Sequence, residues 1–355
     1  MQQLSYFDFN LKLEQDKFGP RRPWVGEWAL TAQCNLRCQH CYVVEDKSKE
    51  ELTFSQIAAI MDELAEAGCL WLTLTGGEPL LRRDALDIYD YARQKGFLIS
   101  LFTNGTLLNE ESLARLAQYP PLMIEITLHS LREEVYERVT RVTGSFRKCM
   151  QAIRDVVERG LPLTVKTVGM ICNKEEVFKI KEFCRGLGDV QFKFDPVVNS
   201  RQDGDTWPIG LRLSADEVMK IVQNDWAMLE QLRQCHADRN NFLESNNLFT
   251  CHAGLTSFHI NPYGELGLCP QMPSPNFNLT RGSFKQGFYD FLYSLRGGVF
   301  DQGSPCRGCE VYHLCGQCPA RALSEIGDVH KPVEYFCELA HRTADIVNLK
   351  EKCIP

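Results

Sequence analysis

The sequence predicts an α/β protein built on a parallel sheet, either open or closed part-way into a barrel, followed by a small cysteine-rich domain. Two observations carry this prediction. Six short apolar runs alternate with amphipathic stretches from residue 28 to about residue 195, and this alternation is typical of parallel sheets. Ten of the sixteen cysteines then fall into three groups, two of which lie beyond residue 250.

The apolar runs are interpreted as buried parallel strands, because they are short, rich in branched residues and apolar on both faces. In order they are "WALTA", "LWLTLT", "LISLFTN", "LMIEITLHS", "LTVKTVGM" and "VQFKFDP". Between them, residues 54–68 and 85–96 have a helical pattern and end at a glycine suited to a C-cap. In such folds the functional site lies at the carboxyl ends of the strands.

The chain changes character after the sixth run. Residues 199–213 form a polar connection, and a helix is expected at about 214–235. From residue 251 short hairpin-like pieces such as "SFHINPYGELGLC" follow, with little apolar periodicity. We therefore expect metal to organise this last part. The predicted domains are an N-terminal extension (1–25), a core (26–213), a connecting helical region (214–250) and a cysteine-rich domain (251–355).

Composition narrows the class of protein. A formal net charge of −7 gives no electrostatic sign of nucleic-acid or anionic-membrane binding. No stretch approaches the ~20 apolar residues of a membrane span, and the first 24 residues lack the apolar core of a signal peptide. Many cysteines without a secretion signal predict a reducing cytoplasm, where clustered thiols are metal ligands rather than disulfides.

Two motifs follow the first two strands. Cys34, Cys38 and Cys41 supply three thiolates, which select zinc or an iron–sulfur centre, and His40 is available to complete a zinc site. In "TGGEP", Gly76 and Gly77 permit close backbone approach to a ligand, and Glu78 can accept hydrogen bonds from an ammonium group. A glycine turn that caps a strand is the plainer interpretation of "GGE".

Together the three-cysteine loop and "TGGEP", at consecutive strand ends, resemble the radical SAM superfamily over roughly residues 28–195. The resemblance implies a partial (β/α)6 barrel of radical SAM type. It also implies a [4Fe–4S] cluster held by Cys34, Cys38 and Cys41. S-adenosylmethionine then chelates the fourth iron, and its cleavage yields a 5′-deoxyadenosyl radical that abstracts a substrate hydrogen.

The same resemblance suggests further cofactor contacts at the strand ends. His40 stands where the family usually has an aromatic residue whose backbone meets the adenine. Polar groups after strands three to five would lie near the methionine carboxylate and the ribose; they are Asn104, Thr127, His129, Ser130 and Lys166. For each of these, an ordinary polar residue at a strand end is an equally good interpretation, and His129 could be a hydrogen-bonded core histidine.

The C-terminal cysteines resemble the SPASM extension of radical SAM enzymes, which carries two auxiliary [4Fe–4S] clusters. Family pairing assigns the outer cluster to Cys306, Cys309, Cys315 and Cys337, and the inner one to Cys251, Cys269 and Cys318. The fourth site of the inner cluster stays unassigned between an open iron and Cys235. The gap of two residues between Cys315 and Cys318 departs from the more common three, and a pair of zinc knuckles is the alternative.

Three functions compete. The first is a maturase of a ribosomally made precursor peptide, which would cross-link it or excise part of its backbone; removal of a tyramine unit is one option. The second is a radical SAM dehydrogenase of a small alcohol or sugar, and the third is a non-catalytic zinc-binding module. The peptide hypothesis implies a separate small leader-recognition (RRE) protein and an external electron donor. Candidate substrate contacts or proton acceptors are Asp195, Asp203 and Asp205, although aspartates are common in turns.

Overall fold

The protein is described by a computed structural model that covers residues 21–239 and 247–348. One nine-stranded sheet runs through it in the order β6-β5-β4-β3-β2-β1-β7-β8-β9. All six predicted strands are present and pair in parallel, each with its neighbour in the sequence. They are β1 (Val25–Ala29), β2 (Trp71–Thr75), β3 (Leu98–Thr103), β4 (Met123–Thr127), β5 (Leu163–Val168) and β6 (Val190–Asp195).

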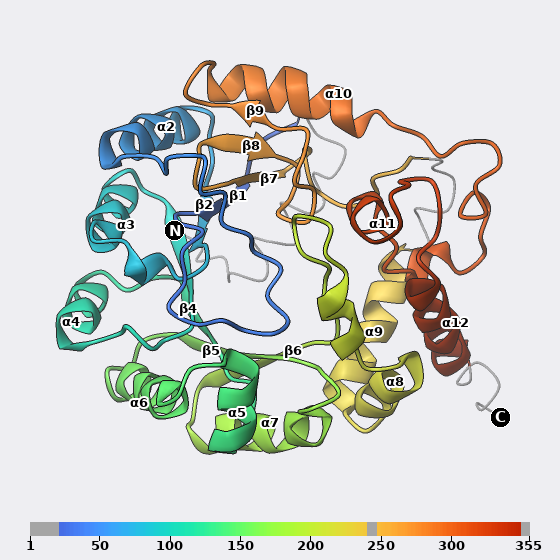
Figure 1. Cartoon of the computed structure of the whole chain (residues 1–355), viewed down its shortest axis with the longest axis horizontal. Helices are drawn as coiled ribbons and strands as arrows, with labels where there is room; N and C mark the ends of the chain where they lie inside the picture. Colours follow the sequence, from blue (N-terminus) through green and yellow to red (C-terminus); the bar gives the residue numbers. More distant parts are fainter. Residues whose placement is uncertain (1–20, 240–246, 349–355) are drawn as a thin grey trace, which may run out of the picture.

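Helices that connect these strands form an arc around the outside of the curved sheet (Figure 1). They are α2 (Phe54–Glu66), α3 (Ala85–Gln94), α4 (Glu110–Gln118), α5 (Glu133–Thr140), α6 (Ser145–Glu158) and α7 (Val177–Gly186), with short turns η1 (Pro79–Leu81) and η2 (Lys174–Glu176). Helix α2 begins with a capping box between Thr53 and Gln56 and ends before Gly68, whose φ of 84° suits glycine. The predicted bounds of α2 and α3 are confirmed to within two residues.

In β1 and β3 every second residue is buried beneath the helices, and the residues between them are only partly buried or exposed. Leu30, Leu72, Ile99, Ile126 and Val165 are almost fully buried in one large apolar core. The alternate residues on the concave side are polar or charged at several positions and are only partly buried. The sheet therefore has an apolar outer layer and a polar interior, which leaves room for a site at its centre.

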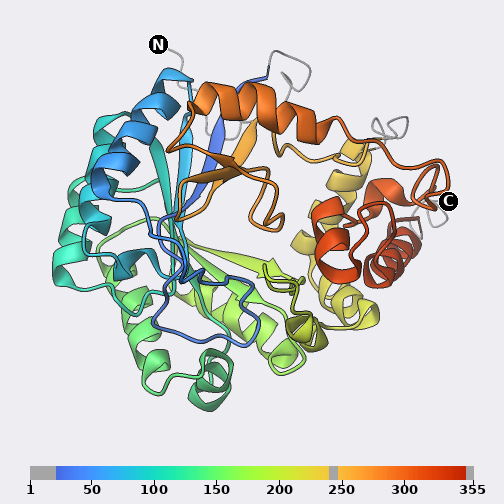
Figure 2. The same ribbon diagram turned by 45° about the horizontal axis from the view of Figure 1, so that its top comes forward.

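The segment after residue 251 joins this sheet. Strand β7 (Ser257–Ile260) pairs in parallel with β1, and β8 (Glu265–Gly267) and β9 (Phe277–Asn278) continue the sheet in antiparallel fashion. The predicted "NPYG" turn connects β7 and β8. The turn η5 (Gln286–Phe291) and helix α10 (Leu292–Arg296) then cover the three strands, as Figure 2 shows.

Side chains of this segment after residue 251 also belong to the large apolar core. They include Phe258, Leu266, Phe284, Phe288 and Phe300. The expectation that the whole region from residue 251 depends on metal for its organisation is therefore wrong for residues 253–300. The strands are two to four residues long, too short for a periodic pattern to stand out in the sequence. Their apolar side chains are buried because β1 lies beside them.

The remaining elements lie across the open side of the sheet (Figures 1 and 2). They are η3 (Trp207–Leu211), α8 (Ala215–Gln223), α9 (Trp226–Arg239), η6 (Tyr312–Leu314), α11 (Pro319–Ile326) and α12 (Glu334–Asn348). The single helix expected at 214–235 is two helices, because Asp225 interrupts it and accepts a hydrogen bond from Met228 N at 3.1 Å as a new N-cap would. Across residues 21–239 and 247–348, no helix is both long and apolar enough to cross a membrane.

Candidate active site

A cavity of about 820 Å³ lies at the carboxyl ends of the parallel strands. Its wall includes all three cysteines of the loop after β1, and the ends of β2 to β6 complete it. Most of the site residues predicted from the sequence are brought together here: Cys34, Cys38, His40, Cys41, Gly76, Gly77, Asn104, Thr127, His129, Lys166, Asp195 and Asp205 line the cavity. Glu78, Ser130 and Asp203 do not.

The three-cysteine loop is held by backbone hydrogen bonds on two sides. Arg37 N and Gln39 N donate to the carbonyls of Thr140 and Val139, at the end of α5, at 2.9 Å each. On the other side, Gly77 N donates to Thr31 O at 2.8 Å and Glu78 N to Gln33 O at 2.9 Å. These bonds fix the position of the thiols by the backbone rather than by side-chain packing.

The close contact between the two loops explains both glycines. A Cβ on Gly76, whose φ is 147°, would lie 2.3 Å from Thr31 O, and one on Gly77 would lie 2.3 Å from Gln33 O. No side chain fits at either position without moving the cysteine loop. The sequence predicted close approach to a ligand, whereas the structure shows close approach to the loop that carries the cysteines.

The three thiols lie close enough to influence one another. Burial raises the pKa of Cys34 to about 11 and raises the pKa values of Cys38 and Cys41. The neighbouring thiolates of Cys41 and Cys34 raise the pKa of Cys38 further. Three adjacent, desolvated thiolates need compensating positive charge, and an iron–sulfur cluster supplies it. The donor set therefore fits a cluster with three cysteine ligands.

No three His, Cys, Asp or Glu side chains converge tightly enough to hold a single metal ion, within the part of the chain that the structure describes. This finding concerns one-ion sites, because the thiolates around a four-iron cluster stand farther apart than those around one ion.

Glu78 is fully buried and is not among the residues that line the cavity. Its oxygens accept hydrogen bonds from Leu80 N at 3.1 Å, Thr103 Oγ1 at 2.8 Å and Asn104 N at 2.7 Å. Burial raises the pKa of Glu78 to about 7, and these hydrogen bonds lower it in part. The carboxylate thus fixes the strand end that carries Asn104, and the contact of Glu78 with an ammonium group stays a prediction.

Asn104 itself lies beside the cysteine loop. Its Nδ2 donates to Asn35 Oδ1 at 2.9 Å and is 3.8 Å from Cys34 Sγ, while its Oδ1 accepts from Thr106. Ser130, by contrast, is fully buried and its hydroxyl donates to Glu176 at 3.1 Å. Ser130 stabilises the turn before α5 and is not on the cavity wall.

His40 and His129 meet at the cavity wall with ring centroids 4.8 Å apart in an edge-on arrangement. Burial lowers the pKa of His40 to about 4 and holds the pKa of His129 well below its usual value. Both rings are therefore neutral near pH 7. Neither Nδ1 has a hydrogen-bond partner within the described residues, so His129 is not the hydrogen-bonded core histidine considered from the sequence.

Lys166 supplies a positive charge on the neighbouring strand β5, where it contributes to the lowered pKa values of His40 and His129. Its ammonium group lies 3.1 Å from the Asp195 carboxylate. Burial lowers the pKa of Lys166, but the carboxylates of Asp195 and Glu125 outweigh that effect and raise it. Thr167 faces the other side of β5 and donates to Leu128 O at 2.8 Å, as the alternation of a strand requires. Asp205 accepts from Trp207 N at 2.9 Å in an exposed turn.

The C-terminal cysteines form two neighbouring sets. Burial, with smaller contributions from the thiolates of Cys337, Cys306 and Cys309, raises the pKa of Cys315 to about 12. Burial also raises the pKa of Cys269 to about 12, with the thiolates of Cys318 and Cys251 adding to it. Cys315 therefore lies near three cysteines of the outer set and Cys269 near two of the inner set, and the assignment of each set to a cluster stays a prediction. Cys235, the spare thiol considered for the inner set, lies outside the described side chains.

Sequence reasoning missed several residues on the cavity walls. Arg141 adopts a left-handed conformation with φ of 57°, and its guanidinium lies 5.5 Å from the Trp207 ring at the cavity. Glu27 and His259 face each other across β1 and β7 and line a smaller cavity that adjoins the first. A glutamate within the apolar run "VGEWA" was a usable signal for Glu27. Nothing in the sequence pairs it with His259, because that contact depends on how β7 joins the sheet.

Comparison with known proteins places these features in one family. Residues 28–184 match the Radical SAM superfamily. The chain is 32% identical to an AdoMet-dependent heme synthase of Methanosarcina barkeri, over 86% of this chain and 94% of that protein. It is 27% identical to the antilisterial bacteriocin subtilosin biosynthesis protein AlbA of Bacillus subtilis, over 85% of this chain and 68% of that protein.

The fold is also similar to a solved structure, that of Streptococcus suis SuiB bound to its precursor peptide SuiA. The TM-score is 0.71 with 15% sequence identity, and the alignment covers 93% of this chain and 80% of SuiB. At this level of identity the likeness concerns the fold alone.

Proposed function

The chain belongs to the radical SAM superfamily, whose members use a [4Fe–4S] cluster and S-adenosylmethionine, and we propose that it modifies a ribosomally made precursor peptide. When bound, the cluster and S-adenosylmethionine supply a 5′-deoxyadenosyl radical that takes hydrogen from the substrate. Cys34, Cys38 and Cys41 hold this cluster, since they are the three thiols on the cavity wall.

Other residues of the wall orient S-adenosylmethionine. The Lys166 ammonium group and the Asn104 amide provide positive charge and hydrogen-bond donors for a carboxylate, and Thr127 offers a hydroxyl beside Lys166 in the strand register. The neutral rings of His40 and His129 give a flat, weakly polar wall suited to the adenine. Glu78 acts on this site through the backbone of Asn104.

The C-terminal sets extend the proposal to two auxiliary clusters. Cys306, Cys309, Cys315 and Cys337 hold the outer cluster, and Cys251, Cys269 and Cys318 hold the inner one. The alternative of two zinc knuckles is disfavoured, because no three His, Cys, Asp or Glu side chains of the described residues converge on a single ion. Iron and sulfide analysis of purified protein separates the two hypotheses. A separate leader-recognition (RRE) protein and an external electron donor are part of the same proposal, as is a cytoplasmic location.

One observation carries the choice of a peptide. A second cavity of about 390 Å³ adjoins the first, and both are lined by Ala32, Tyr42, Val43, Glu45, Thr75 and Gly76. An extended substrate can therefore lie end to end with the cofactor and continue toward Cys269. AlbA, named for bacteriocin biosynthesis, and SuiB, solved with a precursor peptide, support this proposal.

A small-molecule substrate is the second candidate, favoured by the similarity to a heme synthase. The second cavity argues against a tetrapyrrole, whose carboxylate side chains would meet the carboxylates of Glu27, Glu45 and Asp46. A small alcohol or sugar would not require the extended space.

Co-expression with short peptides encoded beside the gene, followed by mass spectrometry, tests the proposal. Loss of two hydrogens identifies cross-linking or oxidation, an unchanged mass indicates epimerisation, and a larger loss identifies excision, including that of a tyramine unit. The variant with Cys34, Cys38 and Cys41 replaced by Ala is the control and leaves each peptide unmodified. Deoxyadenosine formation that responds to a small alcohol or sugar, with every peptide unmodified, would contradict the peptide hypothesis.

A further inference from the structure

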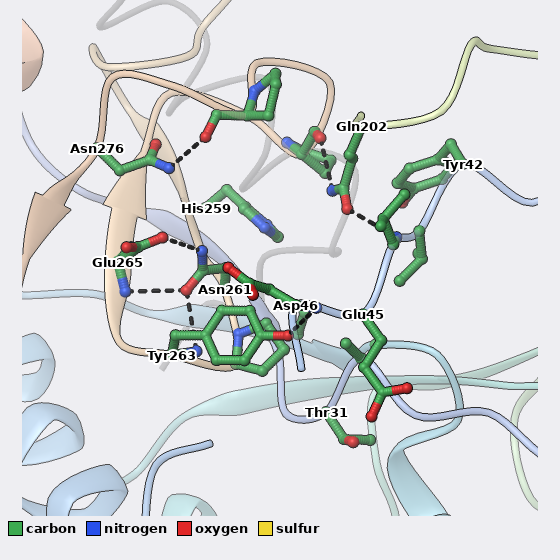
Figure 3. Close-up of a pocket in the computed structure, with 18 of the residues that line it drawn as sticks. Thr31, Tyr42, Glu45, Asp46, Gln202, His259, Asn261, Tyr263, Glu265 and Asn276 are labelled. Carbon is green, nitrogen blue, oxygen red and sulfur yellow. Dashed lines mark hydrogen bonds between the residues drawn. The ribbon is translucent and has the colours of Figure 1, made fainter. Parts of the chain in front are cut away.

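The second cavity, here called the acidic pocket, lies between strand β7 and the chain that follows Cys41 (Figure 3). Glu27 of β1 and His259 of β7 form its floor. Gln202 closes the opposite side, where its side chain accepts from Val44 N at 3.2 Å and donates to Pro270 O at 3.0 Å. The pocket adjoins the main cavity and extends to Cys269.

Carboxylates outnumber cations on its wall. Glu27, Glu45, Asp46, Asp203 and Glu265 line the pocket with Lys49. The ammonium group of Lys49 is already engaged, at 2.7 Å from Glu265 and 3.8 Å from Asp46, and Asp203 lies 3.6 Å from Arg201 Nε.

Glu27 and Glu45 have no such partner: among the described residues, no lysine or arginine lies within ion-pair distance of either. The pocket therefore carries more negative than positive charge beside the radical-forming cavity, and Glu27 is near enough to Lys166 of that cavity to raise its pKa.

His259 provides a second, independent sign of a ligand. Its side chain is 9% exposed, and its ring is directed into the pocket in Figure 3. Its Nδ1 makes no hydrogen bond with any described residue, although it lies 3.3 Å from Glu27 Oε1. A buried ring nitrogen without a partner is costly, and a ligand N–H between His259 and Glu27 would satisfy both groups.

We propose that the acidic pocket binds a positively charged side chain, lysine or arginine, of the substrate next to the residue that loses hydrogen. The proposal rests on the peptide function above and names the class of residue that the enzyme selects. An ammonium or guanidinium group leaving water gains a charge-assisted hydrogen bond to Glu27 and a second hydrogen bond to His259 Nδ1. An aspartate or glutamate at the same place would meet only like charge.

Equilibrium binding of three blocked tripeptides tests this proposal. They are acetyl-Gly-Lys-Gly-amide and its norleucine and glutamate counterparts, titrated by calorimetry into anaerobically reconstituted enzyme with S-adenosylmethionine. Norleucine retains the apolar stem of lysine but has no charge. We expect the lysine peptide to bind about tenfold more tightly than the norleucine peptide, and the glutamate peptide to bind least, since a charge-assisted bond contributes about this factor.

The Glu27→Gln variant keeps the size of the side chain and removes its charge, so the lysine preference should fall to about twofold. Glu45→Gln provides a second variant at an exposed position of the pocket. The matched control is Glu158→Gln, at the exposed end of α6, which changes the net charge equally and should retain the tenfold preference. A control that loses the preference equally would mean that net charge alone attracts the peptide, which overturns the proposal.

Equal binding of the lysine and norleucine peptides to the unmodified enzyme also overturns the proposal and leaves the peptide function intact. If the proposed peptide-modifying function is wrong, the result differs: no precursor is modified in co-expression, although the lysine peptide still binds selectively. The wild-type comparison needs no variant, so a misfolded Glu27→Gln protein would not prevent the test.

Discussion

The protein carries cysteines in two regions that differ in how they are supported. The loop from Cys34 to Cys41 is joined by backbone hydrogen bonds to α5 and to the "TGGEP" turn, both of which rest on the large core. The segment from Cys306 to Cys337 consists of turns, the helix α11 and the start of α12, and its own apolar cluster contains Ala322, Val333 and Phe336. We expect the first region to form without metal, whereas the second, with its small apolar cluster, should depend more on metal binding.

The boundary between these two kinds of region lies near residue 300 rather than residue 251. Strands β7 to β9 and the aromatic side chains of Phe284 and Phe288 belong to the barrel core. Beyond them, α11 is connected to the barrel by polar contacts, in which the Arg212 guanidinium meets Glu325 at 2.5 and 2.9 Å. The comparison therefore separates a region organised by apolar packing from one that polar contacts join to it and that we propose metal organises.

The largest expected effect comes from the first region. Replacing Cys34, Cys38 and Cys41 with Ala should abolish deoxyadenosine production, because alanine cannot ligate iron. The thermal unfolding of the barrel should change little, since backbone bonds hold the loop. Chromatographic measurement of deoxyadenosine checks the first point and calorimetry the second. Cys172→Ala, which removes a thiol outside the three groups, is the control; reductive cleavage by the triple variant would show that the active-site assignment is wrong.

The second region should respond in the opposite way. If each cluster has four irons, the reconstituted protein holds about twelve, and replacing Cys306 and Cys309 with Ala should remove about four. Residues beyond about 300 should then become sensitive to proteolysis, whereas β7 to β9 should stay protected by the core. Deoxyadenosine formation without substrate should survive, and substrate turnover should fail. Cleavage within residues 253–300, or normal product from a protein with four irons, would contradict this division.

The polar connection between the regions should also be measurable. Glu325→Gln leaves the buried Arg212 guanidinium without its counter-charge, which should lower the free energy of opening of α11 by roughly 3–5 kcal/mol. Hydrogen exchange of the α11 amides measures this change. The double variant Arg212→Met with Glu325→Leu should restore most of the loss, because it removes both charges together. An α11 that exchanges as slowly in Glu325→Gln as in the unmodified protein would mean that apolar packing holds it instead.

The smallest effect concerns Glu78 in the barrel. The pKa of a glutamate in the unfolded chain is about 4.3, and burial raises that of Glu78 to about 7. Its contribution to stability is therefore complete below about pH 4.3 and is lost as pH rises through about 7. Glu78→Gln cannot ionise, so its free energy of unfolding should lack a decline on the order of 2–3 kcal/mol between pH 5 and pH 8.

Urea unfolding at pH 5 and pH 8 measures the difference between the two proteins. Glu158→Gln is the control and should keep the decline, because Glu158 is exposed at the end of α6. The same pH dependence in Glu78→Gln as in the unmodified protein would mean that Glu78 is already charged across this range.

The sequence by itself determined the features that depend on local geometry. Apolar runs and hydrophobic periodicity, which extend over a few residues, predicted the six parallel strands and the position of the cysteine loop after β1. Helix-capping signals predicted the glycines that end α2 and α3. The three-cysteine motif and "TGGEP" also identified the superfamily, since spacing along the chain carries that information.

Only the tertiary structure decided which of these residues face the site. Glu78 and Ser130 occupy strand-end positions like those of Asn104 and Thr127, yet their side chains turn inward to bond Asn104 and Glu176. The pairing of β7 with β1, and with it the meeting of Glu27 and His259, joins segments far apart in the sequence. Such contacts arise because apolar faces must be buried together, and a short strand gains its place only from the neighbours it packs against.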